Sequence, residues 1–105
     1  MTIEELQTEL RAFAQARGWG RHHDPKSLTM ALAVEVGEVM EHFQWLGEAE
    51  SYAPADPQGV QEELADVLIY LVQLANQLNV NLTAAVAGKL LINSVKYPAT
   101  PRQEA

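Results

Sequence analysis

The chain contains 105 residues, of which 48% are hydrophobic and 20% are charged, and its formal net charge is -7 at pH 7. This composition indicates one globular domain spanning 1–105 and excludes a disordered chain, while the acidic balance excludes a general nucleic-acid binder. The absence of cysteine excludes disulfides and Cys-ligated zinc. Since no apolar run is long enough to cross a membrane and the polar N-terminus lacks signal-peptide features, we expect a cytoplasmic protein.

Two helices are predicted in the first half of the chain. The first covers about residues 2–17, with Thr2 as its N-cap, and the glycines that follow end it. The second covers about residues 28–46, with Ser27 as its N-cap and Gly47 as its stop. A short loop between them is rich in side chains that can hydrogen-bond or stack.

Two further helices are predicted in the second half. The third covers about residues 57–79, with Asp56 as its cap and Pro57 in its first turn, and the fourth covers about residues 82–95. One broad apolar face of the third helix contains Val60, Leu64, Val67, Leu68, Leu71, Leu74, Ala75 and Leu78, while Ile69 and Val72 lie elsewhere on it. A small domain has few elements to cover such a helix. We therefore expect an all-α, four-helix protomer whose bundle is completed by oligomerisation.

The second and third predicted helices each carry a pair of acids in an otherwise apolar stretch, Glu35 with Glu38 and Glu63 with Asp66. Residues three apart lie on nearly the same side of a helix, so each pair directs two carboxylates the same way. If the helices pack together, two such charges about 4 Å apart repel by about 4 kcal/mol unless a multivalent cation lies among them. Oxygen-only ligands favour Mg²⁺, with Mn²⁺ as a substitute, over Zn²⁺. Glu41 either extends this cluster or lies in water.

Aromatic side chains form a second group of candidates. Individual aromatic residues usually belong to a core, but Tyr70 lies one turn beyond the acids of the third helix, and Trp45 lies two turns beyond those of the second. A flat apolar slot beside a divalent metal suits a nucleobase, because every base has a π face that can stack. His23, in the loop that follows Trp19, is compatible with a solvated role or a binding role.

A third group lies on the predicted fourth helix, where Lys89, Asn93 and Lys96 share one face. These side chains either form a solvated surface or bind phosphate groups beside the metal.

Taken together, these motifs resemble the MazG-type nucleoside triphosphate pyrophosphohydrolases, and most closely the small dCTP pyrophosphatase branch. The resemblance rests on segments 33–45 and 62–71, which contain the two acid pairs, and on segment 89–98, which ends in Tyr-Pro; they follow one another in the family's order. The family's first motif often has a further acid where this chain has Val34, and the dCTP-directed branch is similar to this chain in lacking it.

The resemblance implies an all-α fold and hydrolysis of a nucleoside triphosphate, with dCTP or a modified dCTP as the expected substrate, to the monophosphate and pyrophosphate. By the same resemblance, Mg²⁺ is held by Glu35, Glu38, Glu63 and Asp66, the base is surrounded by Trp19, His23, Trp45 and Tyr70, and the phosphates or sugar meet Lys89, Asn93, Lys96 and Tyr97. Family members form dimers or tetramers that share active sites between subunits, so a homo-oligomer is expected.

Other interpretations stay open at this point. Within the same superfamily, the substrate could be dUTP or phosphoribosyl-ATP. Outside the enzymes, the chain could be a helical assembly module that keeps a metal only for stability. A di-iron carboxylate protein is disfavoured, because it needs Glu-x-x-His pairs, and His42, the only histidine in the predicted helices, directly follows Glu41.

Overall fold

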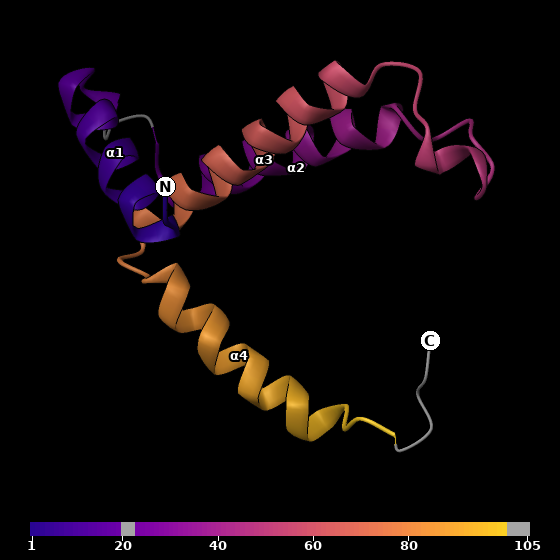
Figure 1. The fold of residues 1–105 in the computed structure, drawn as a ribbon. Coiled ribbons are helices and arrows are strands. Elements are labelled where there is room, and N and C mark those ends of the chain that lie inside the picture. The colour runs from indigo at the N-terminus through magenta and orange to yellow at the C-terminus, as the bar shows by residue number, and fades with distance from the viewer. Residues whose placement is uncertain (20–22, 101–105) are drawn as a thin grey trace.

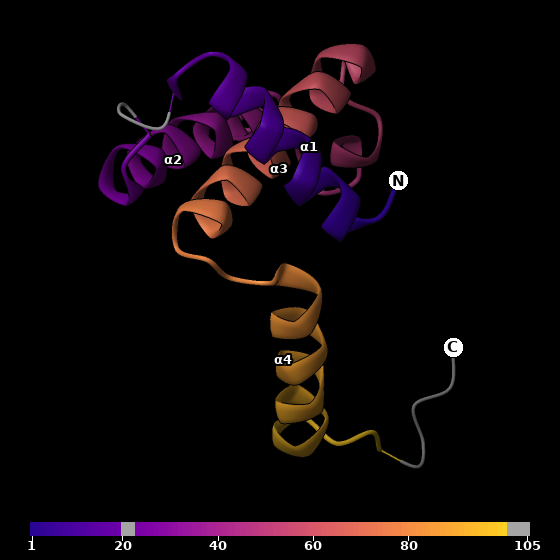
Figure 2. The same cartoon turned by 90° about the vertical axis from the view of Figure 1, so that its left-hand side faces the viewer.

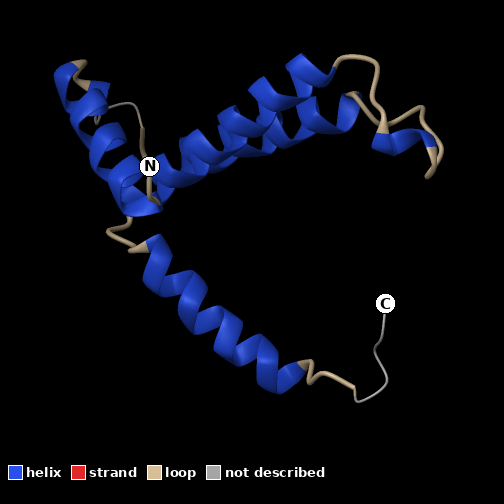
Figure 3. Ribbon diagram, viewed as in Figure 1, coloured by secondary structure: helices blue, strands red, loops and turns tan. Residues whose placement is uncertain are grey.

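The computed structural model describes residues 1–19 and 23–100 and consists of four α-helices joined by loops (Figure 1). The helices and one 3₁₀ turn run in the order α1, α2, η2, α3 and α4, over Ile3–Ala16, Pro25–Glu41, Glu50–Tyr52, Pro57–Gln77 and Leu82–Lys96. No strand occurs in these described ranges (Figure 3), which confirms the all-α, four-helix prediction. None of the helices described is both long enough and apolar enough to cross a membrane. Part of the predicted stacking loop, at 20–22, lies outside the described residues.

Helix starts are set by side chains that accept hydrogen bonds from the first backbone N–H groups. Thr2 accepts from the N–H of Glu5, and the Glu5 carboxylate accepts from the N–H of Thr2, which makes a complete capping box at the start of α1. Asp56 caps α3 and is followed by Pro57, and Asn81 caps α4. The predicted caps of the first and third helices are therefore confirmed.

The second helix begins and ends earlier than predicted. Asp24, and not Ser27, is its N-cap, because the Asp24 carboxylate accepts from both the N–H and the hydroxyl of Ser27. These hydrogen bonds also lower the pKa of Asp24. The prediction was wrong because Pro25, whose missing N–H and fixed φ suit a first helical position, starts the helix one turn sooner.

The predicted end of this helix near residue 46 is also wrong. The helix ends at Glu41, and the next residues form tight turns in which Phe43 and Leu46 donate to carbonyl groups three residues earlier. Gly47 therefore lies beyond the end of the helix and does not terminate it. This earlier end places His42 at the C-cap.

α2 and α3 lie along one another as a hairpin, and α1 crosses α3 towards its C-terminal end (Figures 1 and 2). The buried apolar centre of this three-helix unit is small and contains Leu28, Val72 and Ala75. Val72 was expected to lie off the main apolar face but is fully buried, whereas four residues of the predicted face, Leu64, Leu68, Leu71 and Leu78, are exposed. A helix that is apolar around much of its circumference gives no periodicity from which its packed side can be predicted.

A partly buried set of hydrogen bonds joins α1 to the turn between α3 and α4. The side chain of Gln7, which is 5% exposed, donates to Oδ1 of Asn76 at 3.0 Å and to the carbonyl oxygen of Val80 at 2.9 Å. Its Oε1 accepts from the N–H of Leu82 at 3.2 Å, and Asn76 donates back to the carbonyl oxygen of Gln7 at 3.0 Å. Because each of these groups would be costly to bury alone, the set fixes the point at which α4 begins.

α4 extends away from the other helices, and its packing is with α1 near the start of α4 (Figure 2). None of its residues is buried, and Leu91 and Val95 are 71% and 82% exposed. The radius of gyration is 17.2 Å, against about 13 Å for a compact domain of this length. The accessible surface is 8222 Å², against roughly 5,800 Å² for a compact monomer of this mass. A single copy therefore leaves a large apolar surface uncovered.

Candidate functional site

The packing of α2 against α3 brings the two acid pairs into electrostatic contact. The pKa of Glu35 on α2 is raised above its usual value, first because burial desolvates the carboxyl group and then because it shares a hydrogen bond with Glu38, which requires a proton between them. The negative charges of Glu38, and of Asp66 and Glu63 on α3, raise it further. Since such effects require close approach, the four acids lie around one region between the two helices.

Two carboxylate oxygens in this region are buried, Oε2 of Glu35 and Oε2 of Glu63. The first has no hydrogen-bond partner among the described residues, and the second has a contact with His42 and no other partner among them. A buried acceptor without a donor costs about 1 to 3 kcal/mol or more when charged, and a cation removes that cost. The atoms of these side chains that could bind a metal ion are all oxygens, which fits Mg²⁺ or Mn²⁺.

The acids share this region without having closed around a common point. In the part of the chain that the structure describes, no three Asp, Glu or His side chains already converge as a ligand set for a metal ion. Glu35, Glu38 and Glu63 are half-buried and Asp66 is exposed. Side-chain movements would be needed to draw the four carboxylates onto one ion.

His42 also lies at this site, although sequence analysis did not include it. Its Nε2 is in contact with Oε2 of Glu63, and the two side chains are 19% and 25% exposed. The signal that could have found it is its spacing, because His42 lies one turn beyond Glu38 on the side of α2 that carries the acids. The di-iron pattern considered above does not use that spacing.

Trp19 and His23 lie beside one another at the two ends of the loop between α1 and α2. The ring centroids are 5.3 Å apart with planes tilted by 43°, and Trp19 also packs edge-on against Phe13 at 5.2 Å. The guanidinium of Arg17 lies over the Phe13 ring, 3.3 Å from its centroid, and 5.9 Å from the centroid of the Trp19 ring. The two rings are therefore neighbours, while the expectation that they surround a base stays a prediction.

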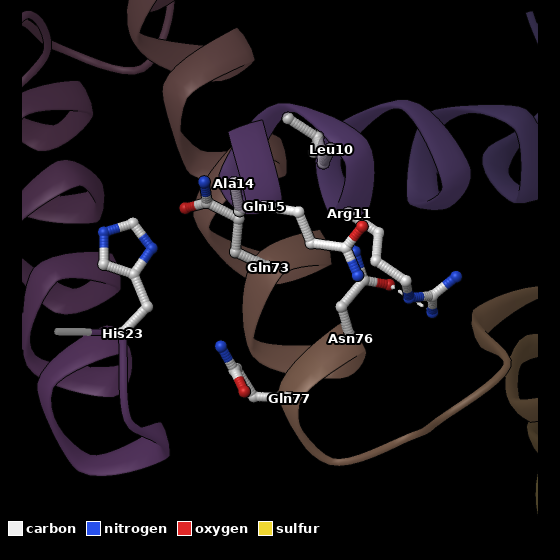
Figure 4. A pocket seen from close by; sticks show the side chains of 8 residues that line it. All are labelled: Leu10, Arg11, Ala14, Gln15, His23, Gln73, Asn76 and Gln77. Atoms are coloured by element: carbon white, nitrogen blue, oxygen red, sulfur yellow. Dashed lines mark hydrogen bonds between the residues drawn. The ribbon is translucent and has the colours of Figure 1, made fainter. Parts of the chain in front are cut away.

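A cavity of about 270 Å³ lies where α1 crosses α3, and His23 is part of its wall (Figure 4). His23 stands on one side of it, and the amides of Gln15, Gln73 and Gln77 lie on the other. Gln73 is 7% exposed, so its amide is presented to the cavity and hardly to bulk water. None of the four acids lines this cavity, and sequence analysis missed its glutamines because polar residues at the end of a helix carry no distinctive pattern.

Two other aromatic candidates differ in their surroundings. Tyr70 is half-buried on α3, one turn beyond Asp66 in the helix, and its role beside the acids stays a prediction. Trp45 is 88% exposed in the turns after α2, so it does not close a slot within a single chain.

The four candidates on α4 and directly after it are not brought to the acids within one chain. Lys89, Asn93, Lys96 and Tyr97 lie on or directly after the helix that extends away from the α2–α3 hairpin (Figure 1). The Lys96 ammonium lies 5.3 Å from the centroid of the Tyr97 ring, and the Tyr97 ring is 68% exposed. The helix itself was predicted, but its direction was not.

The chain is similar to known proteins over most of its length. Residues 30–105 match the MazG-like family. The dCTP pyrophosphatase 1 of Homo sapiens is 43% identical over 102 residues, covering 93% of this chain and 60% of the relative, and that of Rattus norvegicus is 43% identical over 101 residues, covering 92% and 59%. This chain thus spans about 60% of the length of these curated relatives.

A crystal structure of a pyrophosphatase from Archaeoglobus fulgidus superposes on this chain with a TM-score of 0.83 and 40% sequence identity. The match covers 91% of this chain and 92% of that one, so the helical arrangement is shared over nearly the whole of both. Since the family model spans well over half of the sequence and the fold is held in common with a protein of such similarity, the chain belongs to the MazG-like family.

Proposed function

We propose that this protein hydrolyses a nucleoside triphosphate, with dCTP or a modified dCTP as substrate, to the nucleoside monophosphate and pyrophosphate, and that the reaction depends on Mg²⁺ or, in its place, Mn²⁺. The observation that carries the proposal is the raised pKa of Glu35 among three other acids, beside its own buried Oε2, which lacks a hydrogen-bond donor. The choice of dCTP rests on the relatives, which are named dCTP pyrophosphatase 1.

The ion would be held by Glu35, Glu38, Glu63 and Asp66, whose charges repel one another in its absence. When bound, Mg²⁺ supplies neutralisation of the phosphate oxygens and acidification of water, the two effects on which phosphoryl transfer chiefly depends. The net change is that a water oxygen forms a bond to the α-phosphorus while the bond from that phosphorus to the bridging oxygen breaks, which releases pyrophosphate.

The base would be bound near His23 and Trp19, with the cavity between α1 and α3 as the space that it enters. Support comes from the neighbouring rings of Trp19 and His23 and from the amides of the cavity wall, because a binding site for a base needs a flat apolar surface and a few polar groups. Tyr70, between this cavity and the acids along α3, and Trp45 complete the proposed surroundings of the nucleoside.

We further infer a homo-oligomer, a dimer or a tetramer, in which the α4 helix of one copy lies against the hairpin of another. The many large apolar side chains that are exposed on α3 and α4 support this assembly, since large contiguous apolar patches are uncommon on monomers. It would also bring Lys89, Asn93, Lys96 and Tyr97 to the acids of a neighbouring copy, where their charges and donors could meet the phosphates or sugar.

The test is a substrate panel assayed for pyrophosphate in the presence of Mg²⁺ and, separately, of EDTA. The panel contains each dNTP, 5-methyl-dCTP, dUTP and phosphoribosyl-ATP. We expect equal amounts of dCMP and pyrophosphate from dCTP, none with EDTA, and a loss of at least about 100-fold in kcat/KM for Glu38→Gln. The control Glu48→Gln removes an exposed acid from the loop after α2 and leaves kcat/KM unchanged.

Release of orthophosphate in place of pyrophosphate, or full activity of Glu38→Gln, would contradict the proposal. Preference for dUTP or phosphoribosyl-ATP would reassign the substrate within the same reaction. Thermal stabilisation by Mg²⁺ without turnover of any nucleotide would instead identify a helical assembly module that uses a metal for stability.

A further inference from the structure

His42 lies at the junction of α2 and α3 in a space that a glycine leaves open. The ring belongs to the C-cap residue of α2 and lies against the first turn of α3, beside Gly59. A Cβ atom at Gly59 would lie 3.1 Å from Cε1 of His42 and 2.3 Å from Oδ2 of Asp56. The lack of a side chain at this position therefore accommodates both the helix cap and the imidazole ring.

From this position the imidazole meets one particular oxygen of the acid cluster. Nε2 of His42 contacts Oε2 of Glu63, the buried oxygen that otherwise has no hydrogen-bond partner among the described residues. Both side chains are largely withdrawn from solvent, at 19% and 25% exposed. The neighbouring acid on the same helix, Glu62, is exposed and has Gln58 as its hydrogen-bond partner, so the contact with His42 distinguishes Glu63 from the acid beside it.

We propose that His42 is a positioning residue for the metal site, holding Oε2 of Glu63 so that Oε1 is the oxygen offered to the ion. This inference rests on the proposed function, because it gives Glu63 the role of a metal ligand. It goes further in assigning a task to a histidine that lies outside both acid pairs.

The physical reason is that a metal-binding carboxylate with a fixed orientation loses less side-chain entropy on binding than one that rotates freely. Partners of this kind typically contribute about 10- to 100-fold to metal affinity. The same contact could serve only to join the end of α2 to the start of α3. That simpler role would affect the stability of the metal-free protein and leave the affinity of the folded protein for the ion unchanged.

The experiment measures the Mn²⁺ affinity of the metal-free, 105-residue chain from the electron paramagnetic resonance signal of free Mn²⁺, without substrate. Three substitutions at one position separate the explanations. His42→Leu removes the polar contact, His42→Gln keeps an N–H donor as many bonds from the backbone as Nε2, and His42→Asn places its donor one bond closer. Unfolding of each variant in EDTA shows how far the fold itself is affected.

We expect the Kd for Mn²⁺ to rise at least about 10-fold in His42→Leu and His42→Asn, with recovery to within about 3-fold of wild type in His42→Gln. Because the effect passes through Glu63, His42→Leu should weaken binding no further when Glu63→Gln is already present. Both results together would support the inference.

Unchanged Mn²⁺ affinity in His42→Leu would overturn the inference while leaving the metal site in place. The same conclusion would follow if the losses from His42→Leu and Glu63→Gln simply added. If wild type binds no Mn²⁺, or if Glu63→Gln binds it as well as wild type does, the assignment of Glu63 as a ligand fails and the role of His42 fails with it.

Discussion

Glu35, a proposed metal ligand, lowers the stability of the metal-free protein when its carboxyl group is charged. Its carboxyl is desolvated and faces three other acids, so its charged form is disfavoured in the metal-free protein. A neutral amide of nearly the same shape removes this repulsion. Glu35→Gln should therefore raise the unfolding temperature measured in EDTA and abolish the further rise that Mg²⁺ gives to wild type. A lower unfolding temperature in EDTA would show that the carboxylate is favourably paired.

The raised pKa of Glu35 also predicts a dependence on pH. A carboxyl whose pKa is higher in the folded chain binds protons preferentially in that state. Its contribution to stability is thus fully present below its usual pKa and is lost as the pH rises through the raised value. In EDTA, the difference in unfolding temperature between Glu35→Gln and wild type should therefore increase as the pH rises through this range, because the amide does not titrate. A constant difference across a series of buffers would exclude this titration.

The affinity for the metal ion should rise with pH over the same pH range in which the stability of the metal-free protein falls. Because the ion binds the deprotonated acids, its uptake releases protons and its affinity rises with pH. Titration calorimetry of Mg²⁺ into wild type, in buffers that differ in ionisation enthalpy, measures the number of protons released. Release of protons near the raised pKa of Glu35, and little release well above it, is the expected result. A proton count of zero throughout would contradict it.

At the scale of the helices, the sequence predicted those features that depend on interactions within one helical turn, such as the start of a helix. Asp56 followed by Pro57 predicted the start of α3, because a capping carboxylate and a fixed φ act within one turn. The same rule, applied to Ser27 where Asp24 and Pro25 precede it, gave the wrong cap. The spacing within each acid pair was likewise local, and the sequence could place each pair on one side of a helix.

The sequence could not predict which side of α3 packs against the other helices. Val72 is fully buried and Leu64 is 53% exposed, although both are apolar residues of the same helix. The choice between them depends on α1 and α2, which contact α3 from positions distant in the chain. The role of Gln7 was missed for the same reason, because its partners lie more than sixty residues away.

The bonds of Gln7 predict the consequence of breaking the link between α1 and α4. Gln7→Leu keeps the apolar bulk of the side chain but removes the donor to the carbonyl of Val80 and the acceptor of the Leu82 N–H, while Arg11 still donates to Oδ1 of Asn76. Because buried groups without partners cost about 1 to 3 kcal/mol each, we expect the free energy of unfolding to fall by about 2 kcal/mol. Urea denaturation measures it, with the exposed Gln61→Leu on α3 as control. Equal stabilities of the two variants would show that Gln7 is dispensable.

At the scale of the whole molecule, the expectation of an incomplete bundle agrees with the uncovered surface, although the partner that covers it is a proposal. Leu90, on the outer part of α4, is 63% exposed. A charge there should oppose burial against another copy, so Leu90→Glu should shift the mass in light scattering towards that of a single chain. Thr83→Glu adds the same charge to the exposed first turn and should leave the mass unchanged. A wild-type protein that is already monomeric would contradict the assembly.

The proposed sharing of the site between copies can be tested without knowing the geometry of the assembly. Glu38→Gln removes an acid from α2 and Lys89→Ala removes a cation from α4, and each variant alone should be inactive. If the acids of one chain work with α4 of another, a hybrid of the two variants has one site with both defects and one with neither. Random exchange in a dimer should then restore about a quarter of wild-type dCTP hydrolysis.

Restoration in that mixture requires subunit exchange, so the two variants are denatured and refolded together as well as separately. Wild type taken through the same treatment gives the reference activity. If each chain instead folds its own α4 back onto its own acids, every site in the mixture carries one defect and no activity returns. Because α4 lies away from the α2–α3 hairpin within one chain, we expect recovery. That result would make the assembly, and not the protomer, the smallest active unit.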